Sequence, residues 1–188
     1  MGCPTAILIS GSGTNLQSFI DQVKEGHLDL DLRIVFSNNP DAYGLQRALE
    51  SGIPTESFTH RDFPSREAFD RAVAGILDVY EPQLIILAGF MRILTPVITE
   101  NIKAINVHPS LLPLFKGGNA IRESFESSEP TGGISIHWVS NELDGGEILA
   151  QEAFQKEAGE TLESFTAKIR TLEHKLLPET IVQILKVL

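Results

Sequence analysis

The stretch Ala6-Ile7-Leu8-Ile9-Ser10-Gly11-Ser12-Gly13-Thr14-Asn15 decides the fold class of this chain. It begins as a short apolar run, which is typical of a strand buried on both faces of a sheet. It ends in a glycine-rich loop, and an amphipathic pattern over residues 15–25 follows. A buried strand, a glycine loop and a helix in this order indicate a parallel α/β sheet.

The same alternation of apolar runs and amphipathic stretches continues along the chain. It predicts further strands at 32–37, 55–58, 84–88 and 105–108, and helices at 42–51 and 65–80. Ser65 can cap the second of these helices, and Pro82 prevents its continuation. Residues 134–138 alternate between apolar and polar, and a second strand at 147–154 follows a turn at Gly145-Gly146.

The chain closes with a helical pattern from about Thr161, which Pro178 should kink or restart. The predicted fold is therefore a Rossmann-like open, mostly parallel twisted α/β sheet with helices on both faces. An antiparallel strand pair belongs to its C-terminal half.

Length and composition narrow the class of protein. The 188 residues, 42% of them hydrophobic, are expected to form a single domain over 1–188 that buries roughly 70% of its unfolded surface. A net charge of −10 disfavours nucleic acid and anionic membranes as partners. No apolar run approaches the roughly 18 residues of a membrane span, and the N-terminus lacks the basic region of a signal peptide.

The cysteine content bears on the compartment and on metal binding. A lone cysteine, Cys3, excludes an internal disulfide and fits a reducing cytoplasm. His27, His60, His137 and His174 lack metal-ligand spacing, so no metal is expected. We predict a soluble cytoplasmic protein that acts on small molecules, as a monomer or a homodimer.

The glycine loop at residues 10–15 is a candidate phosphate site. Its glycines permit backbone conformations that turn successive N–H groups inward, and the following helix N-terminus favours an anion. The dinucleotide pattern is incomplete, because Leu16 replaces its third glycine and the segment 37–39 holds no acidic residue. A plain tight turn capped by Thr14 or Asn15 is the alternative.

A second candidate site lies at the end of the strand at 105–108. Asn106 and His108 share one strand face at the carboxyl edge of the sheet, where ligands bind in open α/β folds. A carboxamide beside an imidazole can stabilise an oxyanion and move a proton, although two structural hydrogen-bonding residues would look the same. Asp144 precedes two glycines as turn residues often do, yet a carboxylate beside His108 would favour the imidazolium.

Taken together, the motifs resemble the folate-dependent phosphoribosylglycinamide formyltransferase family. The resemblance covers nearly the whole chain, through segments 9–17, 35–38, 87–94, 106–113 and 142–146. It implies the fold described above and a catalytic trio of Asn106, His108 and Asp144. It also implies a loop for the nucleotide phosphate at Gly13, Thr14 and Asn15.

The resemblance further implies residues that bind the two substrates. Glu173, with Arg170 one turn before it, would hold the ribose and glycine part of glycinamide ribonucleotide. The implied folate pocket consists of Arg66, Met91, Arg92, Ile93, Leu94, Asn106, Ser140, Asn141, Glu142, Leu143 and Asp144. The loop 116–119 is either a lid that carries Lys116 or an ordinary solvated loop.

The implied reaction moves the formyl group of the co-substrate 10-formyltetrahydrofolate to the amine of glycinamide ribonucleotide, in purine biosynthesis. Three alternatives stay open. A formyltetrahydrofolate hydrolase usually has an additional N-terminal domain, and a methionyl-tRNA formyltransferase would need a further C-terminal domain and a more basic surface. A nucleotide-binding module without turnover is the third.

Overall fold

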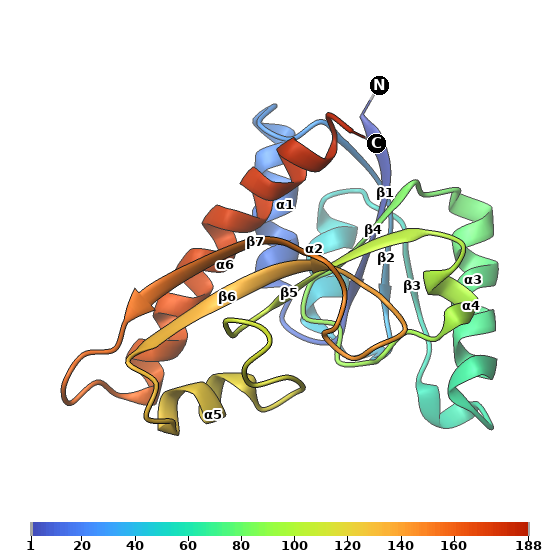
Figure 1. The fold of residues 1–188 in the computed structure, drawn as a ribbon. Coiled ribbons are helices and arrows are strands. Elements are labelled where there is room, and N and C mark those ends of the chain that lie inside the picture. Colours follow the sequence, from blue (N-terminus) through green and yellow to red (C-terminus); the bar gives the residue numbers. More distant parts are fainter. Residues whose placement is uncertain (1, 188) are drawn as a thin grey trace. The chain divides into compact units, whose positions relative to one another are not determined.

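The computed structural model of the chain describes residues 2–187 (Figure 1). They form two compact units, Met1–Ile105 and Asn106–Leu188, and the boundary falls inside strand β5 (Lys103–His108). The described strands are hydrogen-bonded in the order β3-β2-β1-β4-β5-β6-β7. This mixed sheet, mostly parallel with an antiparallel part at its C-terminal end, confirms the predicted α/β class.

The first unit contains the parallel strands that the apolar runs predicted. β1 (Cys3–Ile9) lies between β2 (Leu30–Ser37) and β4 (Leu84–Leu87), and β3 (Thr55–Ser57) extends the sheet beyond β2. Four consecutive side chains of β1, residues 6–9, are completely buried. This burial explains the apolar run, because strands covered on both faces cannot alternate with polar residues.

Helices cover the strands of the first unit. α1 (Thr14–Lys24) contacts α2 (Tyr43–Glu50), and α3 (Arg66–Tyr80) contacts the short α4 (Pro96–Thr99). The two pairs lie on opposite sides of these strands (Figure 1). A 3₁₀ turn, η1 (His60–Asp62), precedes α3.

The ends of α1 and α3 test the predicted caps. The Ser65 hydroxyl accepts a hydrogen bond from the Ala68 N–H at the start of α3, which confirms that cap. At α1, the alternative interpretation of the glycine loop, a turn capped by the side chain of Thr14 or Asn15, is wrong. Gly13 is the N-cap residue, with φ at 70° and no side-chain cap hydrogen bond, and its left-handed backbone ends the loop instead.

The second unit is built on two antiparallel strands and a long helix. β6 (Thr131–Trp138) pairs with β7 (Ile148–Gln155), as the alternating pattern predicted. The short helix α5 (Ala120–Glu126) was not predicted from the sequence. The long helix α6 (Leu162–Ile184) continues through Pro178, so of the predicted kink or restart at this proline the restart does not occur. Leu177, Pro178 and Ile181 are all buried, and this packing offsets the backbone hydrogen bond that proline cannot make.

Gly132 lets α6 approach β6 closely. A Cβ atom on Gly132 would lie 2.5 Å from Cζ of Phe165, a fully buried α6 residue. The Phe165 ring also packs against the rings of Phe125 and Phe154, at centroid distances of 5.6 and 5.0 Å. The aromatic core of the second unit therefore depends on the missing side chain at position 132. None of the helices within residues 2–187 is long and apolar enough to cross a membrane.

We expect Gly132→Ala to lower the free energy of unfolding by about 1–3 kcal/mol, because the new methyl group collides with two packed rings. Urea denaturation followed by circular dichroism measures this change. Gly75→Ala is the control, and we expect it to change the free energy of unfolding in the opposite direction. Gly75 lies in the middle of α3, its new methyl group would meet no neighbour, and the substitution should stabilise the protein by up to about 1 kcal/mol. Equal effects of both substitutions would contradict the packing argument.

Candidate active site

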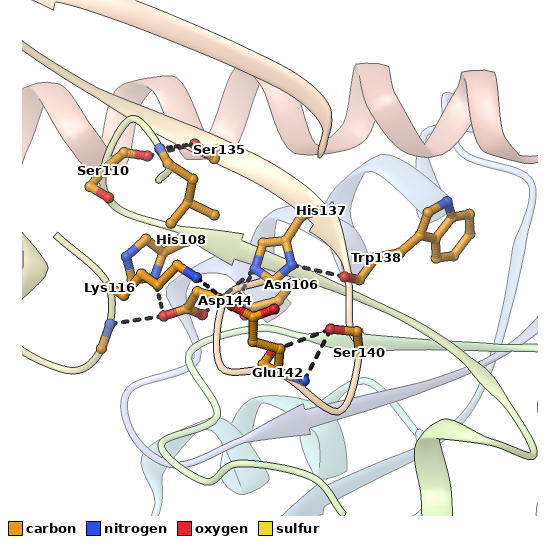
Figure 2. A network of polar contacts seen from close by, with 12 residues as sticks. Asn106, His108, Ser110, Lys116, Ser135, His137, Trp138, Ser140, Glu142 and Asp144 are labelled. Carbon is orange, nitrogen blue, oxygen red and sulfur yellow. Dashed lines mark hydrogen bonds and ion pairs between the residues drawn. The ribbon is translucent and has the colours of Figure 1, made fainter. Parts of the chain in front are cut away.

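The three residues of the predicted trio meet within the second unit (Figure 2). Asn106 and His108 lie two residues apart at the end of β5 and so share one face of the strand. Asp144 lies on the loop between β6 and β7. Nδ1 of His108 lies 3.5 Å from Oδ2 of Asp144, and both side chains are more than nine-tenths buried. The contact that the sequence left undecided is therefore present.

The backbone of the turn presents the Asp144 carboxylate. Asp144 has a left-handed conformation with φ at 47°, and its Oδ2 accepts a 2.8 Å hydrogen bond from the Gly117 N–H. Gly146 passes so close to the Trp138 carbonyl that a Cβ atom would lie 1.6 Å from it. Asp144 is thus both a turn residue and a partner of His108, because the tight turn directs its carboxylate toward the imidazole.

The loop that follows His108 contacts the same groups. Nε2 of His108 lies 2.8 Å from the Phe115 carbonyl oxygen, and the Ser110 hydroxyl donates to the Leu114 carbonyl. Lys116 forms an ion pair with Glu142 at 3.0 Å. The loop predicted as either a lid or a solvated segment therefore lies against the His108–Asp144 pair.

His137 joins the trio, and the sequence analysis missed it. Its Nε2 lies 3.3 Å from Nδ2 of Asn106 and 3.7 Å from Oδ1 of Asp144. Burial lowers the pKa of His137 below its ordinary value, and outweighs the Trp138 carbonyl and the Asp144 charge, which raise it. Side chains alternate between the two faces of β6, so Ser135 and His137 lie on the face opposite Trp138. The sequence does not indicate which residues of other elements contact that face.

The glycine loop has the backbone arrangement that an anion site needs. The Gly11 carbonyl accepts from the Gly44 N–H, and the Gly13 carbonyl accepts from the Gln17 N–H. Because a trans peptide plane points its N–H opposite to its C=O, these bonds turn the N–H groups of Ser12 and Thr14 to the other side of the loop. This arrangement favours the phosphate interpretation over a plain capped turn.

Arg47 is a second residue that the sequence analysis did not identify. Its Nε donates to the Ser12 carbonyl at 2.8 Å, and its Nη1 donates to Gln17 Oε1 at 3.2 Å. The guanidinium also stacks over the ring of Tyr43, with Cζ 4.9 Å from the centroid. Arg47 therefore orients the peptide plane between Ser12 and Gly13 and brings a positive charge to the loop.

The residues expected to bind folate lie in both units. In the first unit, the Met91 N–H donates to the Ser10 hydroxyl, Ile93 is exposed and Leu94 is buried. The Arg92 guanidinium lies 5.4 Å from the ring centre of Phe69, and its buried Nε has no partner among the described residues. Arg66 is the first residue of α3.

In the second unit, the segment Ser140, Asn141, Glu142, Leu143 and Asp144 forms the loop beside His108. The Ser140 hydroxyl accepts from the Glu142 N–H, and the side chain of Leu143 is 42% exposed. Arg170 and Glu173 lie one turn apart on α6, and Arg170 lines a surface hollow of that helix with His174. Burial and the charge of Arg170 lower the pKa of His174. Within residues 2–187, no group of three or more histidine, cysteine or carboxylate side chains could hold a metal ion.

A family profile, curated sequences and solved structures all match this chain to the same kind of protein. The family profile of formyl transferases matches residues 4–181. The phosphoribosylglycinamide formyltransferase of Escherichia coli K12 is 41% identical over 174 residues, which cover 92% of this chain and 82% of that protein. A crystal structure of phosphoribosylglycinamide formyltransferase from Campylobacter jejuni is 45% identical, covers 98% of both chains and superimposes with a TM-score of 0.93.

The human trifunctional purine biosynthetic protein adenosine-3 contains a similar segment. It is 39% identical over 92% of this chain, which corresponds to 17% of the human protein. The family profile and the relatives agree over nearly the whole length of the chain. This protein belongs to the formyl transferase family.

Proposed function

We propose that this protein is a phosphoribosylglycinamide formyltransferase, which transfers the formyl group of 10-formyltetrahydrofolate to the amine of glycinamide ribonucleotide. The observation that carries the proposal is the buried contact of His108 with Asp144 beside Asn106, in a chain whose relatives bear that name. Residues 1–188 would act as one formyltransferase domain in the cytoplasm, on small molecules alone, as a monomer or a homodimer. The reaction needs no metal.

The attacking amine requires little activation. An α-amino group has a pKa near 8, so a usable neutral fraction of the glycyl amine exists at pH 7. Its nitrogen attacks the formyl carbon and forms a tetrahedral oxyanion. The bond from that carbon to N10 of the folate then breaks, and the proton lost by the amine arrives at N10. Tetrahydrofolate and formylglycinamide ribonucleotide are the products.

The enzyme's main task is to stabilise the oxyanion. The Asn106 carboxamide can donate a hydrogen bond to it, and so can Nε2–H of the protonated His108 imidazole once that group leaves the Phe115 carbonyl, its partner at 2.8 Å. Each such donor typically contributes about 3 kcal/mol. Asp144, whose Oδ2 lies 3.5 Å from Nδ1 of His108, orients the imidazole and would stabilise a positive charge on it. His108 or a water aligned by Asp144 would carry the proton from the amine to the leaving nitrogen.

The glycine loop would hold the phosphate of the nucleotide. Gly13, Thr14 and Asn15 provide N–H groups at the positive end of the α1 dipole. Arg170 and Glu173 would contact the ribose and glycine part. Folate binding would fall to Arg66 and residues 91–94 in the first unit and to residues 140–144 in the second, where a partly exposed apolar side chain such as Leu143 can contact the pterin.

The dependence of turnover on the acceptor separates this function from the nearest alternatives. We expect 10-formyltetrahydrofolate, or a dideaza analogue of it, to be consumed only when glycinamide ribonucleotide is present, as followed by absorbance. Consumption without the nucleotide would make water the acceptor and identify a hydrolase. Asn106→Ala should lower turnover by at least about 100-fold, leave a measurable residual rate and leave nucleotide binding intact. A variant unchanged in every assay would contradict the site assignment.

Asp144→Asn should lower kcat by at least about 100-fold, because the neutral amide does not stabilise the imidazolium of His108. Steady-state kinetics at saturating substrates measure the effect. Glu126→Gln is the control, since its exposed carboxylate pairs with Arg122 one turn away and belongs to neither proposed binding site. Similar kcat values for Asp144→Asn and the parent protein would refute the role given to Asp144.

Gly13→Val should weaken binding of the nucleotide by about 10-fold or more and leave folate binding nearly unchanged. A β-branched residue is strained at a φ of 70°, and its Cβ would lie 2.6 Å from Cα of Gly44. Calorimetric titration with each ligand measures both affinities. Gly11→Ala, which adds a methyl group to open space, controls for stability. An equal loss of both ligands by Gly13→Val would indicate general unfolding.

A further inference from the structure

The hydrogen bond of His137 to the backbone fixes its tautomer. Nδ1 of His137 lies 2.9 Å from the carbonyl oxygen of Trp138. A carbonyl oxygen only accepts, so Nδ1 must carry a hydrogen. Burial lowers the pKa of the ring from its ordinary value of 6.5, so the ring is neutral at pH 7. A neutral ring with its hydrogen on Nδ1 presents a lone pair on Nε2.

That lone pair decides which way the Asn106 carboxamide points. Nε2 of His137 lies 3.3 Å from Nδ2 of Asn106, and only the nitrogen end of a carboxamide can donate to it. A flipped amide would place its oxygen against the lone pair, with two acceptors facing each other. The second hydrogen on Nδ2 remains available to another acceptor.

The surroundings of His137 would change if its ring became protonated. The titratable groups that face it are Asp144, His108 and Lys116. Oδ1 of Asp144 lies 3.7 Å from Nε2, so an imidazolium would direct its new N–H to that carboxylate. Asn106 would lose its acceptor, and Asp144 would be shared between two imidazolium rings. Asp144 lies between the two rings in Figure 2.

We propose that His137, as the neutral Nδ1–H tautomer, is a positioning residue that fixes the orientation of the Asn106 carboxamide. It keeps one N–H of Asn106 bonded to its own Nε2 and the other directed at the formyl oxygen. Because its ring stays neutral, His137 does not compete with His108 for the negative charge of Asp144. The inference rests on the proposed function, because Asn106 must donate to the oxyanion for its orientation to matter.

Two variants of similar size test this role. His137→Met removes the acceptor and should lower kcat between about 10- and 100-fold, with KM of both substrates changed less than about twofold. His137→Gln offers an amide oxygen to Asn106 and should recover most of kcat. A wild-type kcat for His137→Met, or no recovery in His137→Gln, would overturn the proposal.

A double-mutant cycle distinguishes positioning from a merely structural role. In an Asn106→Ala background there is no amide to orient, so adding His137→Met should change the residual rate by less than about twofold. The same loss of rate in both backgrounds would refute the proposal. If the parent protein showed no nucleotide-dependent formyl transfer, the proposed function itself would fail, which is a distinct result.

The tautomer is directly observable. Long-range proton–nitrogen spectra of protein labelled with ¹⁵N-histidine should show His137 as the Nδ1–H form at pH 7. The ring should titrate below pH 6.5, in the direction in which burial moves its pKa. The signal is assigned by its absence in His137→Gln, and Asn106→Ala should shift the resonance of Nε2. An Nε2–H tautomer or an imidazolium at pH 7 would overturn the inference.

Discussion

The buried carboxylate of Asp144 is the constraint on which the arrangement of the second unit depends. A carboxylate that is only 8% exposed must find partners that replace water. It obtains them from two segments: the imidazole of His108 on β5 and the N–H of Gly117 on the following loop. One buried charge therefore ties the turn that carries Asp144 to the end of β5 and to the loop that follows it.

The glycine loop of the first unit meets a different requirement. It must expose backbone N–H groups while the carbonyl groups of the same peptide planes stay hydrogen-bonded. Gly44 and Arg47 on α2, together with Gln17 on α1, satisfy the carbonyls of the glycine loop. α2 can come this close because both contact positions lack a side chain: a Cβ atom on Gly44 would lie 2.3 Å from Ile9 and 3.1 Å from Gly13. The backbone arrangement of the proposed anion site is thus a consequence of how two helices pack beside one strand.

Much of this could be predicted from the sequence, and the exceptions share one cause. The fully buried strand β1 was recognisable because its apolar run is local, and the alternation of Asn106 and His108 is likewise a property of one strand. His137 and Arg47 were not recognised, because their roles depend on contacts with residues 31 and 35 positions away. The sequence left open whether Pro178 kinks or restarts α6, since the burial of Pro178 in the unbroken helix is a tertiary effect. Local patterns predict elements, whereas the partners of a side chain depend on strand register and helix packing.

The anchoring of the glycine loop also bears on the thermodynamics of anion binding. Fixing the backbone of a residue costs about 1–2 kcal/mol of conformational entropy, and a loop that orders only around its ligand subtracts this cost from the affinity. Here folding itself has already ordered the loop, through the bonds from Gly44 and Arg47. The proposed phosphate site is therefore preorganised, and the enthalpy of anion binding there would not be offset by the loss of conformational entropy of the loop.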